Sequence, residues 1–324
     1  MSSSSNTGRL LADVGGTNAR LAWQAGPGAA IEHIQVLPVA DHPSLQAAIR
    51  VYLDGLGRQP ALAAIAMANP VTGDRVTMTN HNWTFSQAAL RDELGLRTLR
   101  VLNDFTALAL ALPHLPAEDL RQVGGGAAVA GAALGLLGAG TGLGVSGLLP
   151  DGAGGWVPIA GEGGHVTLPA ANPRERMLMD VLVQRHGHAS AERVTSGMGL
   201  LETCQILCLA DGVDDSAFTS AATVTEAALA GTHAQAVEAL QIFCGVLGSV
   251  AGNLALTLGA RGGVYVGGGV VPRLGTWFDR SPFRERFDAK GRFEGYQSSI
   301  PVWVITAPQS PALLGAACAL DTRP

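Results

Sequence analysis

The sequence predicts an α/β fold with two compact lobes, on the strength of three observations. The chain has 324 residues, more than one hydrophobic core usually organises. Of these residues, 47% are apolar, which is enough for a large buried core. Short apolar runs typical of strands alternate with longer segments of helical spacing. No linker rich in Pro, Ser or charge separates the lobes, so we expect them to be tightly connected.

Strands and helices alternate through the first third of the chain. Residues 9–23 are apolar on both sides of D-V-G-G-T-N, which predicts a strand, a tight turn and a second strand. Helical spacing predicts a helix over 44–58. A buried strand over 61–68 ends at the turn Asn69-Pro70. We then expect a helix starting at the N-cap Ser86, a strand over 99–102, and a helix over 105–112 that stops at Pro113.

The rest of the chain begins with a similar unit and continues mainly with helices. Residues 134–149 carry G-A-G-T-G-L-G between two apolar runs. This similarity to L-A-D-V-G-G-T-N suggests an internal duplication, although two unrelated glycine turns fit the sequence equally well. Helices are predicted over 173–187, 196–210, 222–230, 234–258 and 311–320, and strands over 263–266 and 300–306.

Charge and composition exclude several kinds of partner. The formal net charge is −5 and no basic run exceeds two residues, so we expect no nucleic-acid partner. The polar tail Met1–Arg9 has no apolar segment of a signal peptide, which favours a cytoplasmic protein. The four cysteines include no C-x-x-C pair, so buried thiols in a reducing cytosol are favoured over a metal site.

One uncharged stretch, from Gly124 to Pro150, is long enough to cross a membrane. It is, however, rich in glycine, which is unfavourable inside a helix. Two buried strands around a glycine-rich turn are therefore favoured, and we expect no membrane partner.

Three glycine clusters lie at the ends of predicted strands, at 13–18, 138–144 and 267–269. A phosphate chain needs backbone N–H groups that converge on it without a Cβ in the way. Thr17 and Thr141 can add hydroxyl donors, and Asp13 can hold Mg²⁺ through water. Each cluster alone is also consistent with a plain tight turn, but the three together favour phosphate binding.

Other nucleotide-binding motifs fit less well. There is no G-x-x-x-x-G-K-[ST], and Lys290, the one lysine of the chain, cannot serve a P-loop. The protein-kinase motifs are also missing. A G-x-G-x-x-G begins at Gly142, but an apolar strand follows it where a dinucleotide-binding fold would have a helix.

Polar residues in three segments are candidates for binding or catalysis. Asn103-Asp104 lies at a strand-to-helix junction, where a carboxylate is either an N-cap or a catalytic group. In G-E-G-G-H, Glu162 and His165 lie three apart among glycines, and both a binding segment and a solvated turn fit this pattern. Glu192 is, by its pattern alone, an ordinary surface acid.

These segments, taken together and in order, resemble the bacterial glucokinase family, within the hexokinase and actin-like ATPase superfamily. Each match is modest evidence, but the ordered set is highly specific. There are two departures: Met198 stands where the family often has Pro, and the zinc cysteine cluster of the related repressor–kinase group is missing. The matching segments are D-V-G-G-T-N-A-R (13–20), A-N-P-V-T-G-D (68–74), M-T-N-H-N-W (78–83), L-N-D-F-T-A (102–107), G-T-G-L-G (140–144), G-E-G-G-H (161–165), S-A-E-R-V (190–194) and G-G-G-V (267–270).

The resemblance implies a function and a role for each matched residue. The chain would phosphorylate D-glucose with ATP and Mg²⁺, and Asp104 would be the base toward the sugar 6-hydroxyl. The other sugar hydroxyls would bind Asn103, Glu162, His165 and Glu192. Mg²⁺ would bind Asp13 through water, and the adenosine would lie near Gly268 and Gly269. The phosphates would lie on the backbone of Ala12, Asp13, Val14, Gly15, Gly16, Thr17, Gly138, Thr141 and Gly142.

The resemblance also implies an architecture, the two-domain actin-like ATPase (ribonuclease H-like) fold with a cleft between a small and a large α/β domain. Because the C-terminal helix of the family returns to the small domain, we expect domains at 1–115 plus 306–324 and at 116–305. The family also suggests a homodimer.

Three other functions stay open on the sequence alone. A kinase of the same build for mannose, fructose or an N-acetylated hexosamine would have the same spacing. A non-enzymatic sugar sensor or repressor would need a DNA-binding segment, for which the tail Met1–Arg9 is short. A nicotinamide-dependent oxidoreductase would rest on the weak glycine match at 142–147.

Overall fold

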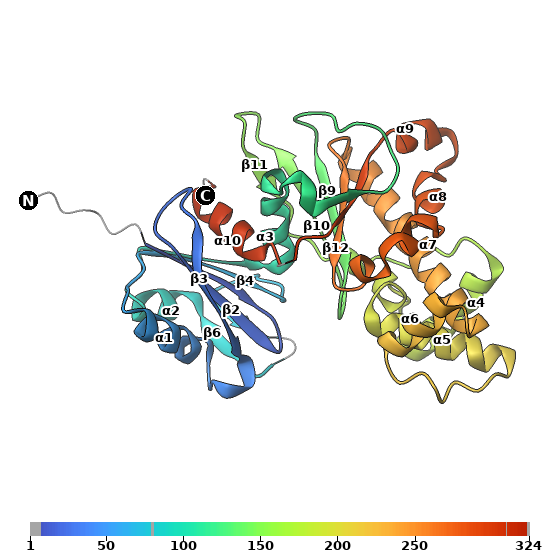
Figure 1. The fold of residues 1–324 in the computed structure, drawn as a ribbon, viewed down its shortest axis with the longest axis horizontal. Coiled ribbons are helices and arrows are strands. Elements are labelled where there is room, and N and C mark those ends of the chain that lie inside the picture. Colours follow the sequence, from blue (N-terminus) through green and yellow to red (C-terminus); the bar gives the residue numbers. More distant parts are fainter. Residues whose placement is uncertain (1–7, 79–80, 309, 323–324) are drawn as a thin grey trace, which may run out of the picture. The chain divides into compact units, whose positions relative to one another are not determined.

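The computed structural model describes residues 8–78, 81–308 and 310–322 (Figure 1). Most of the predicted N-terminal tail, and Thr79-Asn80 of the segment 78–83, lie outside these ranges. The chain divides into two compact units. Unit 1 comprises Met1–Leu115 and Ala307–Pro324, and unit 2 comprises Pro116–Thr306.

Unit 1 contains a five-stranded sheet in the order β3-β2-β1-β4-β7. The hairpin pairs β1–β2 and β2–β3 are antiparallel, whereas β1, β4 and β7 run parallel to one another. A separate two-stranded ribbon pairs β5 with β6. The strands are β1 (Arg9–Val14), β2 (Asn18–Gln24), β3 (Ile31–Pro38), β4 (Leu62–Met67), β5 (Arg75–Thr77), β6 (Thr84–Ser86) and β7 (Thr98–Asn103).

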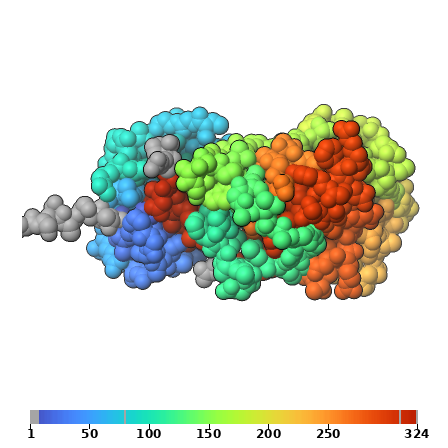
Figure 2. All heavy atoms as spheres, turned by 90° about the horizontal axis from the view of Figure 1, so that it is seen from above, coloured from blue at the N-terminus to red at the C-terminus, as the bar shows by residue number. Residues whose placement is uncertain are grey.

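Helices cover both faces of the sheet in unit 1, because successive side chains of β1 point to opposite faces. Leu10 packs in one cluster with Ile49 of α1, and Leu11 packs in another with Leu313 of α10. The red residues of the C-terminal helix lie among the blue and cyan residues of the N-terminal segment (Figure 2). The helices of unit 1 are α1 (Leu45–Leu56), α2 (Gln87–Glu93), α3 (Asp104–Ala111) and α10 (Ala312–Asp321).

The helices of unit 1 begin and pack as their sequences dictate. Ser86 caps α2 as predicted, because its side chain accepts a hydrogen bond from the backbone N–H of Ala89. Helices α10 and α3 approach closely at Gly315, where an added Cβ would lie 1.7 Å from the carbonyl oxygen of Ala107. The return of the C-terminal helix to unit 1 therefore depends on a residue without a side chain.

Unit 2 contains a six-stranded sheet in the order β11-β10-β9-β12-β13-β8. The uncharged stretch of the sequence contains the antiparallel hairpin β9–β10, which confirms the prediction of two buried strands around a glycine turn. The strands are β8 (Leu120–Gln122), β9 (Leu134–Ala139), β10 (Leu143–Pro150), β11 (Trp156–Pro158), β12 (Val264–Gly268) and β13 (Val302–Ile305).

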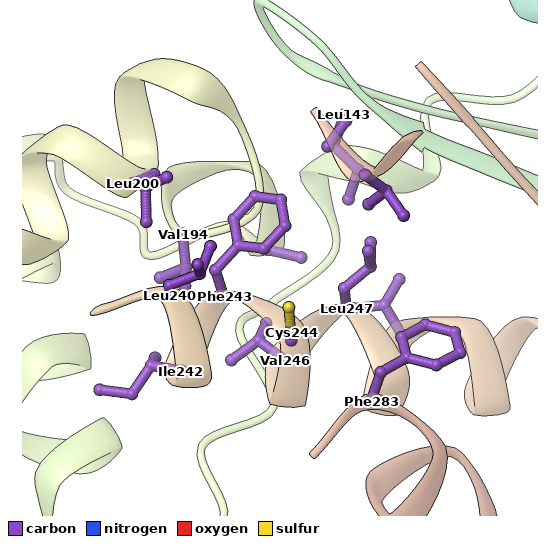
Figure 3. Close-up of a cluster of buried hydrophobic side chains, with 14 of the residues drawn as sticks. Leu143, Val194, Leu200, Leu240, Ile242, Phe243, Cys244, Val246, Leu247 and Phe283 are labelled. Atoms are coloured by element: carbon purple, nitrogen blue, oxygen red, sulfur yellow. The ribbon is translucent and has the colours of Figure 1, made fainter. Parts of the chain in front are cut away.

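The core of unit 2 is built around one long helix, α7 (Ala234–Leu258), whose bounds match the prediction. Figure 3 shows its buried residues, among them Phe243 and Leu247, with side chains from neighbouring segments around them. Among the described helices, α7 alone is long and apolar enough to cross a membrane, but 78% of its most apolar window is buried, as in a core helix. The other helices are α4 (Pro173–His186), α5 (Gly197–Asp211), α6 (Ala221–Ala230), α8 (Phe283–Asp288) and α9 (Glu294–Ser298).

The two sheets share one topology. The order β3-β2-β1-β4-β7 in unit 1 corresponds strand for strand to β11-β10-β9-β12-β13 in unit 2, with hairpin pairs on one side and parallel pairs on the other. Of the two interpretations left open by the sequence, this correspondence favours the internal duplication.

Candidate functional site

The parallel strands of unit 1 bring two of the predicted segments to one edge of the sheet. Val14 pairs with Met67, and Met67 pairs with Asn103. Neighbouring strands are about 4.8 Å apart, so the ends of β1 and β7 are separated by roughly 10 Å. Because parallel strands end at the same edge, the Asp13 turn and the Asn103-Asp104 junction lie on the same side of unit 1.

The structure of the junction after β7 shows whether Asp104 is the N-cap of the helix that follows. The N-cap of α3 is Asn103, whose Oδ1 accepts hydrogen bonds from the N–H groups of Phe105 (2.9 Å) and Thr106 (3.2 Å). Asp104 is the first residue of the helix, is half-buried, and accepts a hydrogen bond from the N–H of Phe105 at 2.9 Å. The partial positive charge of a helix N-terminus stabilises a carboxylate in this position.

Asn69 lies at the same edge of the sheet, and its sequence pattern predicted only a turn residue. It follows β4, between the ends of β1 and β7, and is 4% exposed. Its Nδ2 donates to the carbonyl of Thr77 at 2.8 Å, and its own carbonyl accepts from Nδ2 of Asn103 at 3.4 Å. Asn69 thereby links the junction before α3 to the ribbon β5–β6. The one signal in the sequence was an amide side chain directly after a buried strand.

Asp13 lies in a nearly closed environment at the end of β1. It pairs across the hairpin with Arg20, whose Nη1 lies 3.1 Å from its Oδ2. Burial raises the pKa of the Asp13 carboxyl above its ordinary value, whereas Arg20 and a hydrogen bond with Ser310 act in the opposite direction. Burial therefore works against the charged form of Asp13, and its two partners work in favour of it.

The first predicted phosphate loop is partly buried. Ala12 and Val14 are fully buried within the sheet, so their side chains belong to the core. Gly15 and Gly16 are half-buried and Thr17 is exposed, which places their backbone groups at the surface of unit 1. The accessible part of this loop is therefore the turn itself.

The second and third glycine clusters lie side by side in unit 2. In the parallel pair β9–β12, Gly138 is opposite Gly267 and Ala139 is opposite Gly268. At Gly138 an added Cβ would lie 2.6 Å from the backbone carbon of Gly267, so this close approach requires glycine. The exposed residues of the two loops are Thr141, Gly268 and Gly269.

The two predicted sugar segments of unit 2 also lie together. They form two short 3-10 helices, Gly163–His165 and Ala191–Arg193. The N–H of Ala191 donates to the carbonyl of Val166 at 2.8 Å, which joins the two segments. Glu162 and His165 are exposed, which is consistent both with a binding segment and with a solvated turn.

Glu192 is not an ordinary surface acid, contrary to what its pattern suggests. It is half-buried, and its Oε2 accepts a hydrogen bond from the N–H of Leu143 at 2.9 Å. Leu143 directly follows the glycine turn of β9–β10. No local pattern in the sequence could indicate this contact, since the two residues are far apart in the chain.

The buried cysteines are unsuited to thiolate chemistry. Cys204, Cys208 and Cys244 are buried, as predicted, and burial raises the pKa of Cys204 and of Cys244 to about 12. Among residues 8–78, 81–308 and 310–322, no group of three or more His, Cys, Asp or Glu side chains is arranged to hold a metal ion.

Comparisons with known proteins identify the family. The family model of glucokinases matches residues 10–323. The chain is 54% identical to a glucokinase of Chromobacterium violaceum over 313 residues, 96% of this chain and 89% of that one. It is also 54% identical to a glucokinase of Aromatoleum aromaticum over 316 residues, 97% of this chain and 94% of that one.

A solved structure agrees with these relatives. The crystal structure of a glucokinase from an Antarctic psychrotroph superimposes with a TM-score of 0.87 at 34% identity, covering 97% of this chain and 99% of that one. The predicted fold class, a two-domain α/β fold of the actin-like ATPase type, is confirmed. The chain belongs to the glucokinase family.

Proposed function

We propose that the chain transfers the γ-phosphoryl group of ATP to the 6-hydroxyl of D-glucose, with Asp104 as general base. Membership of the family supports the reaction. The observation that carries the assignment of the base is the strand register of unit 1, in which a carboxylate at the start of α3 and the Asp13 turn share one edge of the sheet. Phosphoryl transfer needs such alignment more than it needs covalent chemistry.

In this proposal, Asp104 accepts the proton of the attacking hydroxyl. The hydrogen bond from the N–H of Phe105 and the positive end of α3 favour the ionised carboxylate, which is the form that a base requires. The cap formed by Asn103 fixes the start of the helix and so the position of its first residue. A positioned base of this kind contributes about 10²–10⁴ in rate.

Sugar selection is assigned to Asn103, Glu162, His165 and Glu192. Each offers a polar group that must find a hydroxyl, so an epimer leaves one of them unpaired at a cost of about 1–3 kcal/mol. The amide nitrogen of Asn103 remains a donor while its oxygen caps α3. A carboxylate such as Glu162 accepts from two neighbouring hydroxyls, which suits a hexose.

The phosphates of ATP are assigned to the turns 12–17 and 138–142, and the adenosine to the neighbourhood of Gly268 and Gly269. The register of β9 with β12 supports this grouping, because it places the two glycine clusters of unit 2 side by side. Backbone N–H groups in such turns suit phosphate oxygens.

The chemistry of Asp13 fits a magnesium ion that is held through water beside the phosphates. A single carboxylate with Arg20 at 3.1 Å is a weak site by itself, which matches an ion that brings its own waters and phosphate ligands. Bound there, Mg²⁺ would neutralise charge on the phosphates. Asp13 and Arg20 would be the charged side chains beside the turn that follows β1.

Three further assignments belong to this proposal. The domains are taken as 1–115 plus 306–324 and 116–305, the first supplying the base and the second most of the sugar ligands. We also propose a cytoplasmic enzyme and a homodimer, both of which rest on the likeness to the family.

The proposal is tested by ADP release in the presence of individual sugars. Glucose should give the highest kcat/KM, and mannose, fructose, galactose and N-acetylglucosamine should give clearly lower values. A preference for one of these other sugars would keep the kinase and replace the substrate. Binding of glucose without any ADP release would instead support a sensor.

A further inference from the structure

The carboxylate of Glu192 bridges a predicted sugar segment and a predicted phosphate loop within unit 2. Its backbone belongs to the 3-10 helix Ala191–Arg193, and its Oε2 accepts a hydrogen bond from the N–H of Leu143 at 2.9 Å. Leu143 is the first residue of β10, directly after the turn Gly140–Gly142. An acid assigned to sugar binding therefore touches the loop that is assigned to phosphate binding.

The turn is shaped to admit this carboxylate. An added Cβ at Gly142 would lie 2.4 Å from Oε2 of Glu192, closer than any ordinary contact. The carboxylate thus occupies the space that a side chain at position 142 would take. A phosphate loop needs glycine for the approach of phosphate, and here glycine is also needed for the approach of Glu192.

Both partners of this hydrogen bond are anchored in the same core. The side chains of Leu143 and of Val194, two residues after Glu192, lie in the cluster of buried residues around α7 (Figure 3). A second bond ties the other end of the turn to the same segment, because the N–H of Gly197 donates to the carbonyl of Gly140 at 2.8 Å. The segment 192–197 therefore holds the turn at both ends.

We propose that Glu192 is a positioning residue for the second phosphate loop as well as a sugar ligand, so that it couples sugar binding to nucleotide binding. This inference rests on the proposed function. A carboxylate has two oxygens. One can accept a hydrogen bond from the N–H of Leu143 while the other accepts a hydrogen bond from a sugar hydroxyl. A sugar that orders the carboxylate then also orders the loop, and the coupling is reciprocal.

The test separates the two roles of Glu192 by comparing Glu192→Ala with Glu192→Gln. The probe is ADP, titrated calorimetrically into the full chain with and without glucose. Glu192→Ala removes a charge-assisted hydrogen bond, so ADP binding without sugar should weaken by roughly tenfold. Glu192→Gln keeps a carbonyl oxygen that can accept a hydrogen bond from the N–H of Leu143, so its ADP affinity without sugar should be close to the wild-type value. Its glucose affinity should be lower than that of the wild type, because the charge of the sugar ligand is lost.

Two further variants guard against a merely structural effect. Gly142→Ala displaces the carboxylate of Glu192 but also places a methyl group in the phosphate loop. It is therefore measured both alone and combined with Glu192→Ala, and it should weaken ADP binding less in the combined variant than in the wild type. Glu226→Ala removes an exposed acid of helix α6 in the same unit, so it should leave both ADP binding and glucose binding unchanged. Melting temperatures of all variants establish that the titrated proteins are folded.

Results that would overturn the coupling differ from results that would overturn the proposed kinase reaction. Unchanged ADP affinity in Glu192→Ala, or no recovery in a folded Glu192→Gln, would overturn the coupling even if the wild type phosphorylates glucose. A wild type that binds ADP but transfers no phosphate to glucose would contradict the function, while the sugar-free ADP titrations would still decide whether Glu192 positions the loop.

Discussion

The hairpins β1–β2 and β9–β10 occupy the same place in two sheets of the same topology. The carboxylate beside each hairpin, however, comes from a different part of the chain. In unit 1 the acid is part of the strand, since Asp13 is the penultimate residue of β1. In unit 2 the corresponding position of β9 is Gly138, and the acid beside the turn is Glu192, from a segment far along the chain. The close approach of β12 leaves no room for a side chain at Gly138.

The two units also differ in where they carry their acids and glycines. Unit 1 carries its acids at the ends of its parallel strands, with Asp13 at the end of β1 and Asp104 directly after β7. Unit 2 has glycines at the ends of β9 and β12, and its acids come from the segments around Glu162 and Glu192. Acids at strand ends suit proton and magnesium chemistry, whereas glycines at strand ends suit the close approach of a nucleotide.

The largest effect is expected from the acid at the end of β7. Asp104→Asn should lower kcat by about 10²–10⁴, because it removes the proposed base while keeping the shape of the side chain. Glucose affinity, measured by calorimetry, should stay close to the wild-type value. The matched control is Asp92→Asn, an exposed acid of α2 that pairs with Arg91. Near-normal turnover of Asp104→Asn would remove Asp104 from the mechanism.

An intermediate effect is expected where the two hairpins differ. Gly138→Ala should lower the stability of the protein by about 1–3 kcal/mol, because the added methyl group would overlap the backbone of Gly267. Gly140→Ala is the control, since no atom lies within 4 Å of the Cβ it would add. Urea denaturation measures both. Equal stabilities of the two variants would show that β12 does not dictate glycine at position 138.

The smallest effect is expected from the partner of Asp13. Arg20→Met removes the charge that lowers the pKa of Asp13 and leaves the burial that raises it, so this pKa should rise further. A carboxyl with a higher pKa becomes protonated at a higher pH. The acidic limb of kcat/KM for ATP should therefore move to higher pH, by a fraction of a unit because Arg20 is half-exposed.

A surface pair supplies the control for this shift. Arg50→Met breaks an exposed pair with Glu93, at 3.6 Å, and should leave the pH profile unchanged. A profile of Arg20→Met that moves to lower pH, or does not move, would contradict the assignment of a functional charge to Asp13.

Local patterns were enough to predict much of the fold. The two hairpins, the cap at Ser86 and the long helix α7 follow from turn chemistry and from the spacing of apolar residues. Strand β3 was not predicted, because it lies at the edge of its sheet and most of its residues are exposed. Helix α8 was also missed, since it is a single short segment of mixed aromatic and charged residues.

Fewer features of the candidate site could be predicted from local sequence patterns. The junction at Asp104 could be recognised because it interrupts two apolar segments, although the assignment of the cap to Asn103 needed the structure. Glu192 could not be recognised, because its significance lies in a contact with Leu143 that only the folded chain creates. Asn69 looked like a turn residue for the same reason.

The most direct test of the proposed reaction is the ratio of glucose 6-phosphate formed to ADP released, measured on the same sample of the wild-type protein with ATP, Mg²⁺ and glucose. A transfer to the 6-hydroxyl predicts equal amounts of the two products at all times. ADP formed without glucose 6-phosphate, or a phosphate on another hydroxyl, would contradict the account.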